Sequence, residues 1–140
     1  MLKILYKGWI VENFDAPEDY NEGHTWYIGE ILTINDSGTI SKANDTTTTP
    51  VGLAMEMRQP PVGSDYTFDQ TASSGKVSLL TGEALIETDV YESGVSFSIN
   101  DVVKVGPNGR MTNTGEGQTI GRVREVSTNG VIKVFFRPSV

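Results

Sequence analysis

The amino-acid sequence predicts an all-β protein of 140 residues. Fifteen glycines and many Thr, Ser and Asn residues indicate frequent turns between short strands. Several segments alternate apolar and polar residues, and none shows a convincing 3.6-residue apolar period. One stretch also recurs, because GEILTINDSGTISKANDTTTTPVGLAMEM at 29–57 is similar to NDVVKVGPNGRMTNTGEGQTIGRVREV at 100–126. We therefore expect an all-β fold with an internal duplicated hairpin unit.

The repeat consists of strand and turn residues and not of reactive side chains. The two copies coincide in their hydrophobic and glycine positions once a gap of two residues is allowed. Aligned pairs include Ile31 with Val102, Gly38 with Gly109 and Gly52 with Gly121. We interpret the repeat as architecture, and we expect partner contacts in the segments that lie outside it, residues 1–27 and 58–74.

Residues 1–27 are predicted to form an N-terminal strand followed by an acidic arm. Leu2 and Ile4 share one face of a strand within residues 1–11. Residues 12–24, ENFDAPEDYNEGH, contain a proline, a glycine and no periodicity, which is typical of a loop or an extended arm. Phe14 and Tyr20 in this segment need a surface, either the sheet of their own chain or a neighbouring molecule.

Residues 28–140 are predicted to form the β domain. A half-buried strand over 26–34 leads into the turn NDSG at 35–38, and the second copy has GPNG at the equivalent place. Gly38 and Gly109 supply the positive φ that closes each turn. Gly52 and Gly121 lie inside strands, where a glycine marks a bulge or a close approach of two backbones.

The connection between the two copies is irregular. Pro60 and Pro61 exclude a central strand, so residues 58–74 are predicted to be a long insertion that the second copy lacks. Tyr66 and Phe68 alternate within it and are candidates for packing on the body or on a partner.

Further strands are predicted after the insertion. Short strands are expected on either side of the break at Gly82. Val95, Phe97 and Ile99 alternate with polar residues and give the clearest single-face strand pattern in the chain. The turn at Asn129 and Gly130 is a strong hairpin signal between strands at 122–126 and 131–136.

Charge and composition exclude several classes of partner. The formal net charge of −7 argues against nucleic acid, because phosphate binding requires clustered Lys and Arg. Residues 8–41 contain seven acids and no Lys or Arg, whereas residues 104–137 contain six bases and two acids. Opposite signs at the two ends favour oriented contacts between molecules or an ordinary solvated surface. No apolar run is long enough to cross a membrane, so we expect a soluble chain made in the cytoplasm.

The sequence favours a non-enzymatic protein without a cofactor. It has no cysteine and one histidine, His24, so neither a nucleophile–histidine pair nor a zinc site is expected. Calcium stays open at residues 15–22 or 35–36, although neither segment has the spacing of a dedicated calcium loop. The carboxylates Asp65 and Asp69, or Glu83 and Glu87, offer glycosidase pairs with almost no specificity.

Aromatic residues are the candidates for partner contacts. These are Trp9, Phe14, Tyr20, Trp26, Tyr66 and Phe68. Trp and Tyr residues are also able to form a carbohydrate-binding platform, although in an all-β domain they more often complete a core or an interface.

Several short motifs resemble the capsid decoration, or cement, proteins of tailed bacteriophages, the broad group related to the lambda head decoration protein. The motifs are GEALI at 82–86, NDVV at 100–103, GRMT at 109–112, IGRV at 120–123 and GVIKV at 130–134, with PVGLA at 50–54 as a second instance. The resemblance covers roughly residues 28–136.

The resemblance implies a tulip- or barrel-like β fold that is often assembled as a homotrimer. It implies binding to the major capsid protein on the outside of a matured head, where an N-terminal arm reaches onto the capsid surface. The expected location is therefore the capsid exterior of a virion. A carbohydrate- or receptor-binding β domain of a phage tail or fibre is the alternative function, and a small hydrolase is a weaker third.

Overall fold

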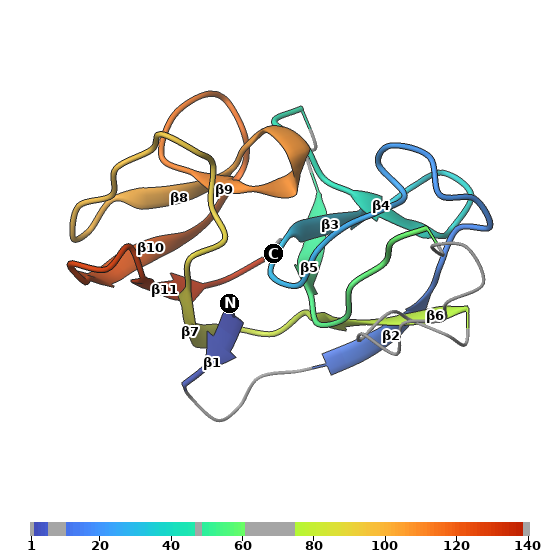
Figure 1. The fold of residues 1–140 in the computed structure, drawn as a ribbon, viewed down its shortest axis with the longest axis horizontal. Coiled ribbons are helices and arrows are strands. Elements are labelled where there is room, and N and C mark those ends of the chain that lie inside the picture. Colours follow the sequence, from blue (N-terminus) through green and yellow to red (C-terminus); the bar gives the residue numbers. More distant parts are fainter. Residues whose placement is uncertain (1, 6–10, 47–48, 61–74, 139–140) are drawn as a thin grey trace.

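The computed structural model describes residues 2–5, 11–46, 49–60 and 75–138, and its strands form two antiparallel sheets (Figure 1). The predicted all-β class is confirmed. The two sheets stay open. The strands therefore do not form a closed barrel, which is one of the two forms that the resemblance implies. The strands are β1 (Leu2–Ile4), β2 (Val11–Asp15), β3 (Ile31–Ile34), β4 (Ile40–Lys42), β5 (Pro50–Ala54), β6 (Lys76–Leu80), β7 (Ala84–Thr88), β8 (Val102–Val105), β9 (Met111–Thr112), β10 (Thr119–Val126) and β11 (Ile132–Phe136).

The chain contains the same five-stranded arrangement twice. One sheet has the order β2-β6-β5-β3-β4, and the other has the order β1-β7-β11-β10-β8-β9. Without β1, the second order matches the first strand by strand, and every corresponding pair is antiparallel. We call β2–β6 the first unit and β7–β11 the second unit. Figure 1 shows the first unit, blue to yellow-green, beside the second unit, olive to red.

The repeat in the sequence also matches in pairing register. Leu32 pairs with Gly52 in the first unit, and its aligned residue Val103 pairs with Gly121 in the second. Each of these ladders is interrupted one residue before the glycine, so both units carry a bulge at the aligned position.

Each strand glycine lies against the backbone of the next strand. A Cβ on Gly52 would lie 2.2 Å from the Leu80 carbonyl oxygen, and one on Gly121 would lie 2.4 Å from that of Phe135. The predicted close backbone approach is therefore confirmed at both positions. Only glycine allows β5 to meet β6, and β10 to meet β11, at these distances.

The two hairpin turns use different residues for the same bond. The Asn35 amide donates to the Thr39 carbonyl at 2.9 Å, and the Gly106 amide donates to the Arg110 carbonyl at 2.8 Å. The second turn contains the 3-10 turn η1 (Pro107–Gly109). Gly38 and Gly109 have φ of +84° and +69°. The positive φ predicted for both turn glycines is therefore confirmed.

The last hairpin joins β10 to β11. The Ser127 amide donates to the Val131 carbonyl at 3.0 Å, and the Asn129 side chain accepts from the Ser127 hydroxyl. Gly130 has φ of +84°, which completes the turn.

Two apolar clusters form the interior. The larger cluster contains residues of both units, among them Ile31 and Leu53 of the first and Val134 and Phe136 of the second. The smaller cluster belongs to the first unit, where Trp26 packs over the other face of the sheet. The first sheet is thus buried on both faces, and the six-stranded sheet contributes one face to the shared core.

The strand predicted around Val95, Phe97 and Ile99 is wrong. This segment forms no strand; Phe97 is instead buried in the larger core cluster and Val95 packs against that cluster. Ile99 is 62% exposed. The alternation reflects two anchoring contacts of a connection, because the amides of Val95 and Ser98 bond within it, to the Glu92 carbonyl at 3.4 Å and to the Asp101 carboxylate at 2.8 Å.

The described part of the N-terminal segment packs on its own chain. β1 pairs with β7, and β2, part of the predicted loop, pairs with β6 along its whole length. Trp9, Tyr66 and Phe68 lie outside the described residues, as does most of the 58–74 insertion.

Candidate functional site

The acidic loop, residues 16–25, is held in place by one buried arginine. The Arg58 guanidinium donates to the backbone carbonyls of Asp19 and His24 at 2.7 and 2.6 Å and to that of Pro17 at 2.5 Å. Arg58 is 5% exposed, so these bonds compensate a desolvated charge. A loop without regular structure is thereby fixed at three points.

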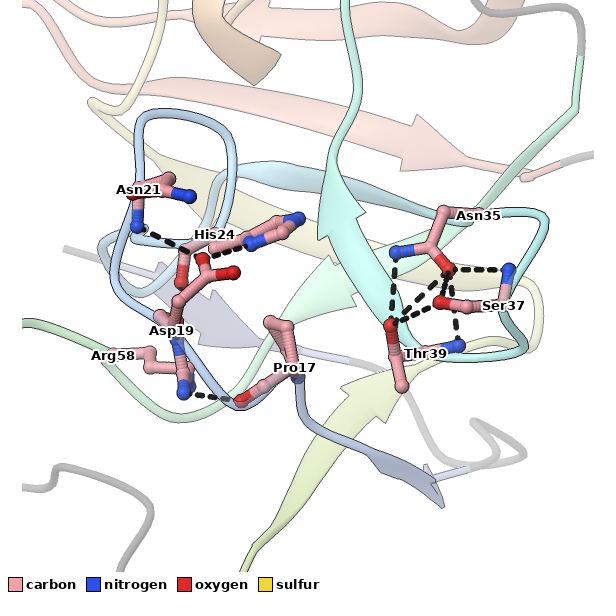
Figure 2. A network of polar contacts seen from close by, with 8 residues as sticks. All are labelled: Pro17, Asp19, Asn21, His24, Asn35, Ser37, Thr39 and Arg58. Carbon is pink, nitrogen blue, oxygen red and sulfur yellow. Dashed lines mark hydrogen bonds and ion pairs between the residues drawn. The ribbon is translucent and has the colours of Figure 1, made fainter.

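Aromatic rings surround the same guanidinium. The Tyr20 ring centroid lies 4.1 Å from the Arg58 guanidinium carbon, and that of Trp26 lies 5.9 Å away. Burial lowers the pKa of Arg58, but a guanidinium stays charged at any physiological pH. Figure 2 shows Arg58 below the loop, pointing toward Pro17.

Arg58 reaches this position because its strand segment pairs with that of Trp26. The two residues exchange backbone hydrogen bonds at 2.9 and 3.0 Å as an isolated antiparallel bridge. Trp26 itself is fully buried, and its indole N–H donates to the Glu56 carbonyl at 3.0 Å. Its side chain therefore belongs to the core and is not accessible to a partner.

The other described aromatic candidates differ in exposure. Phe14 is half-buried and packs against the same cluster as Trp26. Tyr20 is 40% exposed and covers Arg58 with one ring face. Of the predicted contact residues that the structure describes, Tyr20 alone is substantially open to solvent.

A second network orders the outer part of the loop. The His24 Nδ1 lies 2.5 Å from the Asp19 carboxylate, and the Asn21 amide donates to the same oxygen at 3.1 Å (Figure 2). These hydrogen bonds lower the pKa of Asp19 below its ordinary value, and the bond with His24 has the larger effect. The imidazole is thus engaged in the structure of the loop.

Two of the side chains considered for calcium, Asn35 and Asp15, have protein partners. The Asn35 Oδ1 accepts from the amide and hydroxyl of Ser37 and from Thr39, as Figure 2 shows. The Asp15 carboxylate pairs with Lys76. Among the described residues there is no group of three or more His, Asp or Glu side chains placed to hold a metal ion.

A buried ion pair joins the two units. Glu30 is 2% exposed, and its carboxylate accepts from Arg110 Nε at 2.9 Å and from the Tyr27 amide at 2.7 Å. Lys42 Nζ lies 3.7 Å from it. A Cβ on Gly109 would lie 2.8 Å from the Ile31 carbonyl oxygen, so the turn of the second unit rests directly on the first.

The six-stranded sheet has a hollow on the face turned away from the shared core. It measures about 210 Å³ and is lined by Glu87, Glu125, Ser127, Asn129, Val131 and Lys133. Sequence reasoning did not identify this place or Arg58. Their residues come together only through strand register and through contacts between distant segments.

Comparison with protein-family models gave no match. Comparison with curated proteins gave none either. Within the described ranges, no helix has the length and apolar character needed to cross a membrane.

Proposed function

We propose that this protein is a structural virion protein that binds the outer surface of a bacteriophage capsid and stabilises the matured head. The resemblance to decoration proteins supports this proposal. Five of its six motifs, those between residues 82 and 134, lie in or directly beside the strands of the second unit. The sixth motif, at 50–54, is strand β5 of the first unit. It has the place in its sheet that β10 has in the second unit.

The observation that carries the proposal is the preformed acidic loop. Glu18, Asp19 and Glu22 are exposed on it, while Arg58 fixes its backbone from below. A loop that is already ordered loses little conformational entropy when a partner binds. It therefore suits a static contact with a rigid surface.

Charge indicates what that surface is like. Residues 11–80 contain eleven acidic and three basic residues, net −8, whereas residues 83–137 contain seven acidic and six basic residues, net −1. Complementary potential orients a binding protein and rejects wrong partners. We infer that the first unit faces a basic patch of the major capsid protein.

Weak individual contacts are sufficient for this role. A capsid presents many equivalent sites. When bound neighbours also associate with one another, their binding is linked, and the overall avidity exceeds the affinity of a single site. The buried Glu30 and Arg58 are both committed to structural contacts, which favours a binding role over a catalytic one.

Binding to expanded, undecorated phage heads tests the proposal. Cosedimentation and electron microscopy are expected to show saturable binding at a repeating lattice position, with heads that resist heat better than bare ones. Failure to bind any expanded head preparation would sink the proposed function.

The acidic loop is tested with a charge-neutral variant. Combining Glu18→Gln with Glu22→Gln is expected to weaken head binding about tenfold or more and to reduce its salt dependence. Glu116→Gln, which makes one such change at an exposed site of the second unit, is the control, and each loop substitution is also measured alone against it. Equal binding by both variants would show that the loop is not the contact.

The hollow on the six-stranded sheet gives the alternative function its one support. Carboxylate, amide, hydroxyl and ammonium groups converge there, as they do in carbohydrate sites. A glycan-binding domain of a tail or fibre would show a shift in intrinsic Trp or Tyr fluorescence when glycans are added. The capsid proposal expects no such shift.

A further inference from the structure

The outer face of the six-stranded sheet is the face turned away from the shared core. Ala84 and Ile86 of β7 point into the core, as do Val134 and Phe136 of β11. Their neighbours along each strand therefore point outward. The outward side chains form three rows across the strands.

The first row alternates in charge across four strands. Lys3 on β1 is opposite Glu87 on β7, Glu87 is opposite Lys133 on β11, and Lys133 is opposite Glu125 on β10. The Lys133 and Glu125 groups lie 3.1 Å apart. The row therefore reads plus, minus, plus, minus from the sheet edge inward.

The second row is apolar and the third is again charged. Leu5, whose amide donates to the Leu85 carbonyl, begins the second row, which continues through Leu85 to Phe135. Arg122 of β10 is opposite Phe135 and ends the row, and the Arg124 guanidinium lies over the Phe135 ring at 5.3 Å.

The third row consists of Glu83 and Arg137. Their side chains lie 3.0 Å apart, just beyond the ends of β7 and β11.

The corresponding face of the first unit is an interface already. By strand order and register, Leu80 corresponds to Phe135 and Leu53 to Arg122. Leu80, Leu53 and Ile31 are fully buried in the core that joins the two units. In the second unit the side chains of this face are exposed or half-buried, and Leu5 is 36% exposed on it.

We propose that the outer face of the six-stranded sheet binds a second copy of this chain through a two-fold axis. The axis lies parallel to the strands, between β7 and β11. Such an axis reverses the order of the strands and keeps each row opposite itself.

The two charged rows are complementary to themselves under that operation, and the second row brings its apolar residues together at the axis. In the first row Lys3 faces Glu125 of the second copy, and Glu87 faces Lys133. In the second row Leu85 faces Phe135. In the third row Glu83 lies on one side of the axis and Arg137 on the other. Glu83 therefore faces Arg137 of the second copy.

The size of the patch sets the expected affinity. Four strands spaced about 4.8 Å apart and three rows about 7 Å apart span only roughly 14 by 14 Å. This is smaller than the face of a standard interface, which buries about 800 Å² per partner. We therefore expect a weak, salt-sensitive dimer that forms at high concentration, as on a crowded lattice.

Analytical ultracentrifugation of the full chain tests the proposal. At about 0.02 M salt a dimer is expected to form with rising concentration, and at about 0.5 M salt it should dissociate at least tenfold more readily. A monomer at every concentration up to about 1 mM, far above a micromolar Kd, would overturn the proposal. So would the trimer that the family resemblance implies, because a ring of three uses a different, head-to-tail contact.

Charge reversal supplies the decisive arm. Lys133→Glu places two like-charged pairs across the axis, and so does Glu87→Lys, so each variant alone is expected to stay monomeric. A mixture of the two variants has opposite charges at all four positions of the row. The mixture should therefore form a heterodimer at least as tight as the wild-type dimer.

A matched control separates this contact from general charge effects. Lys76→Glu reverses an exposed lysine that also pairs across two strands, but on the first unit. It is expected to dimerise like the wild type, and near-ultraviolet circular dichroism checks that all variants are folded. Failure of the mixed variants to associate would contradict the two-fold geometry. Head binding is not part of these measurements, so their outcome is independent of the proposed function.

Discussion

Arg58 shows how a single residue can order a segment that has no regular structure. In the sequence it lies between Met57 and Gln59 at the start of an irregular stretch, and the nearby acid, Glu56, accepts from Ser78 instead. The partners of Arg58 are carbonyl groups about forty residues earlier, and every residue has a carbonyl. Sequence patterns carry no signal for such bonds, so the loop was predictable and its anchor was not.

The Asp19 pKa offers a test of the loop at residue scale. Its folded-state pKa lies below the ordinary 3.8, chiefly because of the hydrogen bond from His24. The ionised form is therefore favoured by folding. This stabilisation is fully present above about pH 4 and is lost as the pH falls through the lowered value.

Carbon-detected NMR titration of the Asp19 carboxyl group measures this directly. We expect a midpoint below 3.8 in the wild type and a shift back toward 3.8 in His24→Gln. An unchanged Asp19 midpoint in His24→Gln would show that the imidazole does not order the loop.

At the scale of elements, the repeat was the most informative part of the sequence. Its hydrophobic and glycine positions predicted two equivalent hairpins, because backbone geometry restricts both kinds of position. The alternating segment at 95–99 misled for a physical reason. Burial of every second side chain needs only a surface beneath it, whereas a strand also needs a neighbour for its amides.

The candidate site was less accessible to sequence reasoning than the fold. Residues 12–24 were predicted as loop or arm, yet Val11–Asp15 form an edge strand on β6. Trp26, named as a contact, is core. The charged row on the six-stranded sheet depends on register between distant segments, such as Lys3 with Glu87, and local patterns do not fix such register.

Alanine substitution of the strand glycines tests the equivalence of the two units. In Gly52→Ala and Gly121→Ala the new methyl group would lie 2.2 and 2.4 Å from a backbone oxygen, which cannot move without disrupting the ladder. Each change is expected to lower the free energy of unfolding by about 3 kcal/mol. Gly38→Ala, in an open turn, should cost only about 1 kcal/mol. Urea denaturation would contradict this view if all three variants lost similar stability.

For the whole molecule, the two units share one core and are not independent domains. The larger apolar cluster contains side chains from both, and Glu30 of the first unit is buried against Arg110 of the second. Separation would expose that cluster and leave a carboxylate without its main cation. Far-ultraviolet circular dichroism and Trp fluorescence should therefore report one coincident unfolding transition.

The ion pair between the units gives the sharpest test of this coupling. Arg110→Met leaves Glu30 buried with only Lys42 and the Tyr27 amide, so we expect a loss of about 2 kcal/mol in the free energy of unfolding. Adding Glu30→Gln removes the stranded charge and should recover part of that loss, because the carboxylate no longer needs a cation. Arg122→Met, an exposed arginine on β10, is the control and should change stability by less than about 0.5 kcal/mol. Full additivity of the Arg110 and Glu30 changes in urea denaturation would mean that the pair does not couple the units.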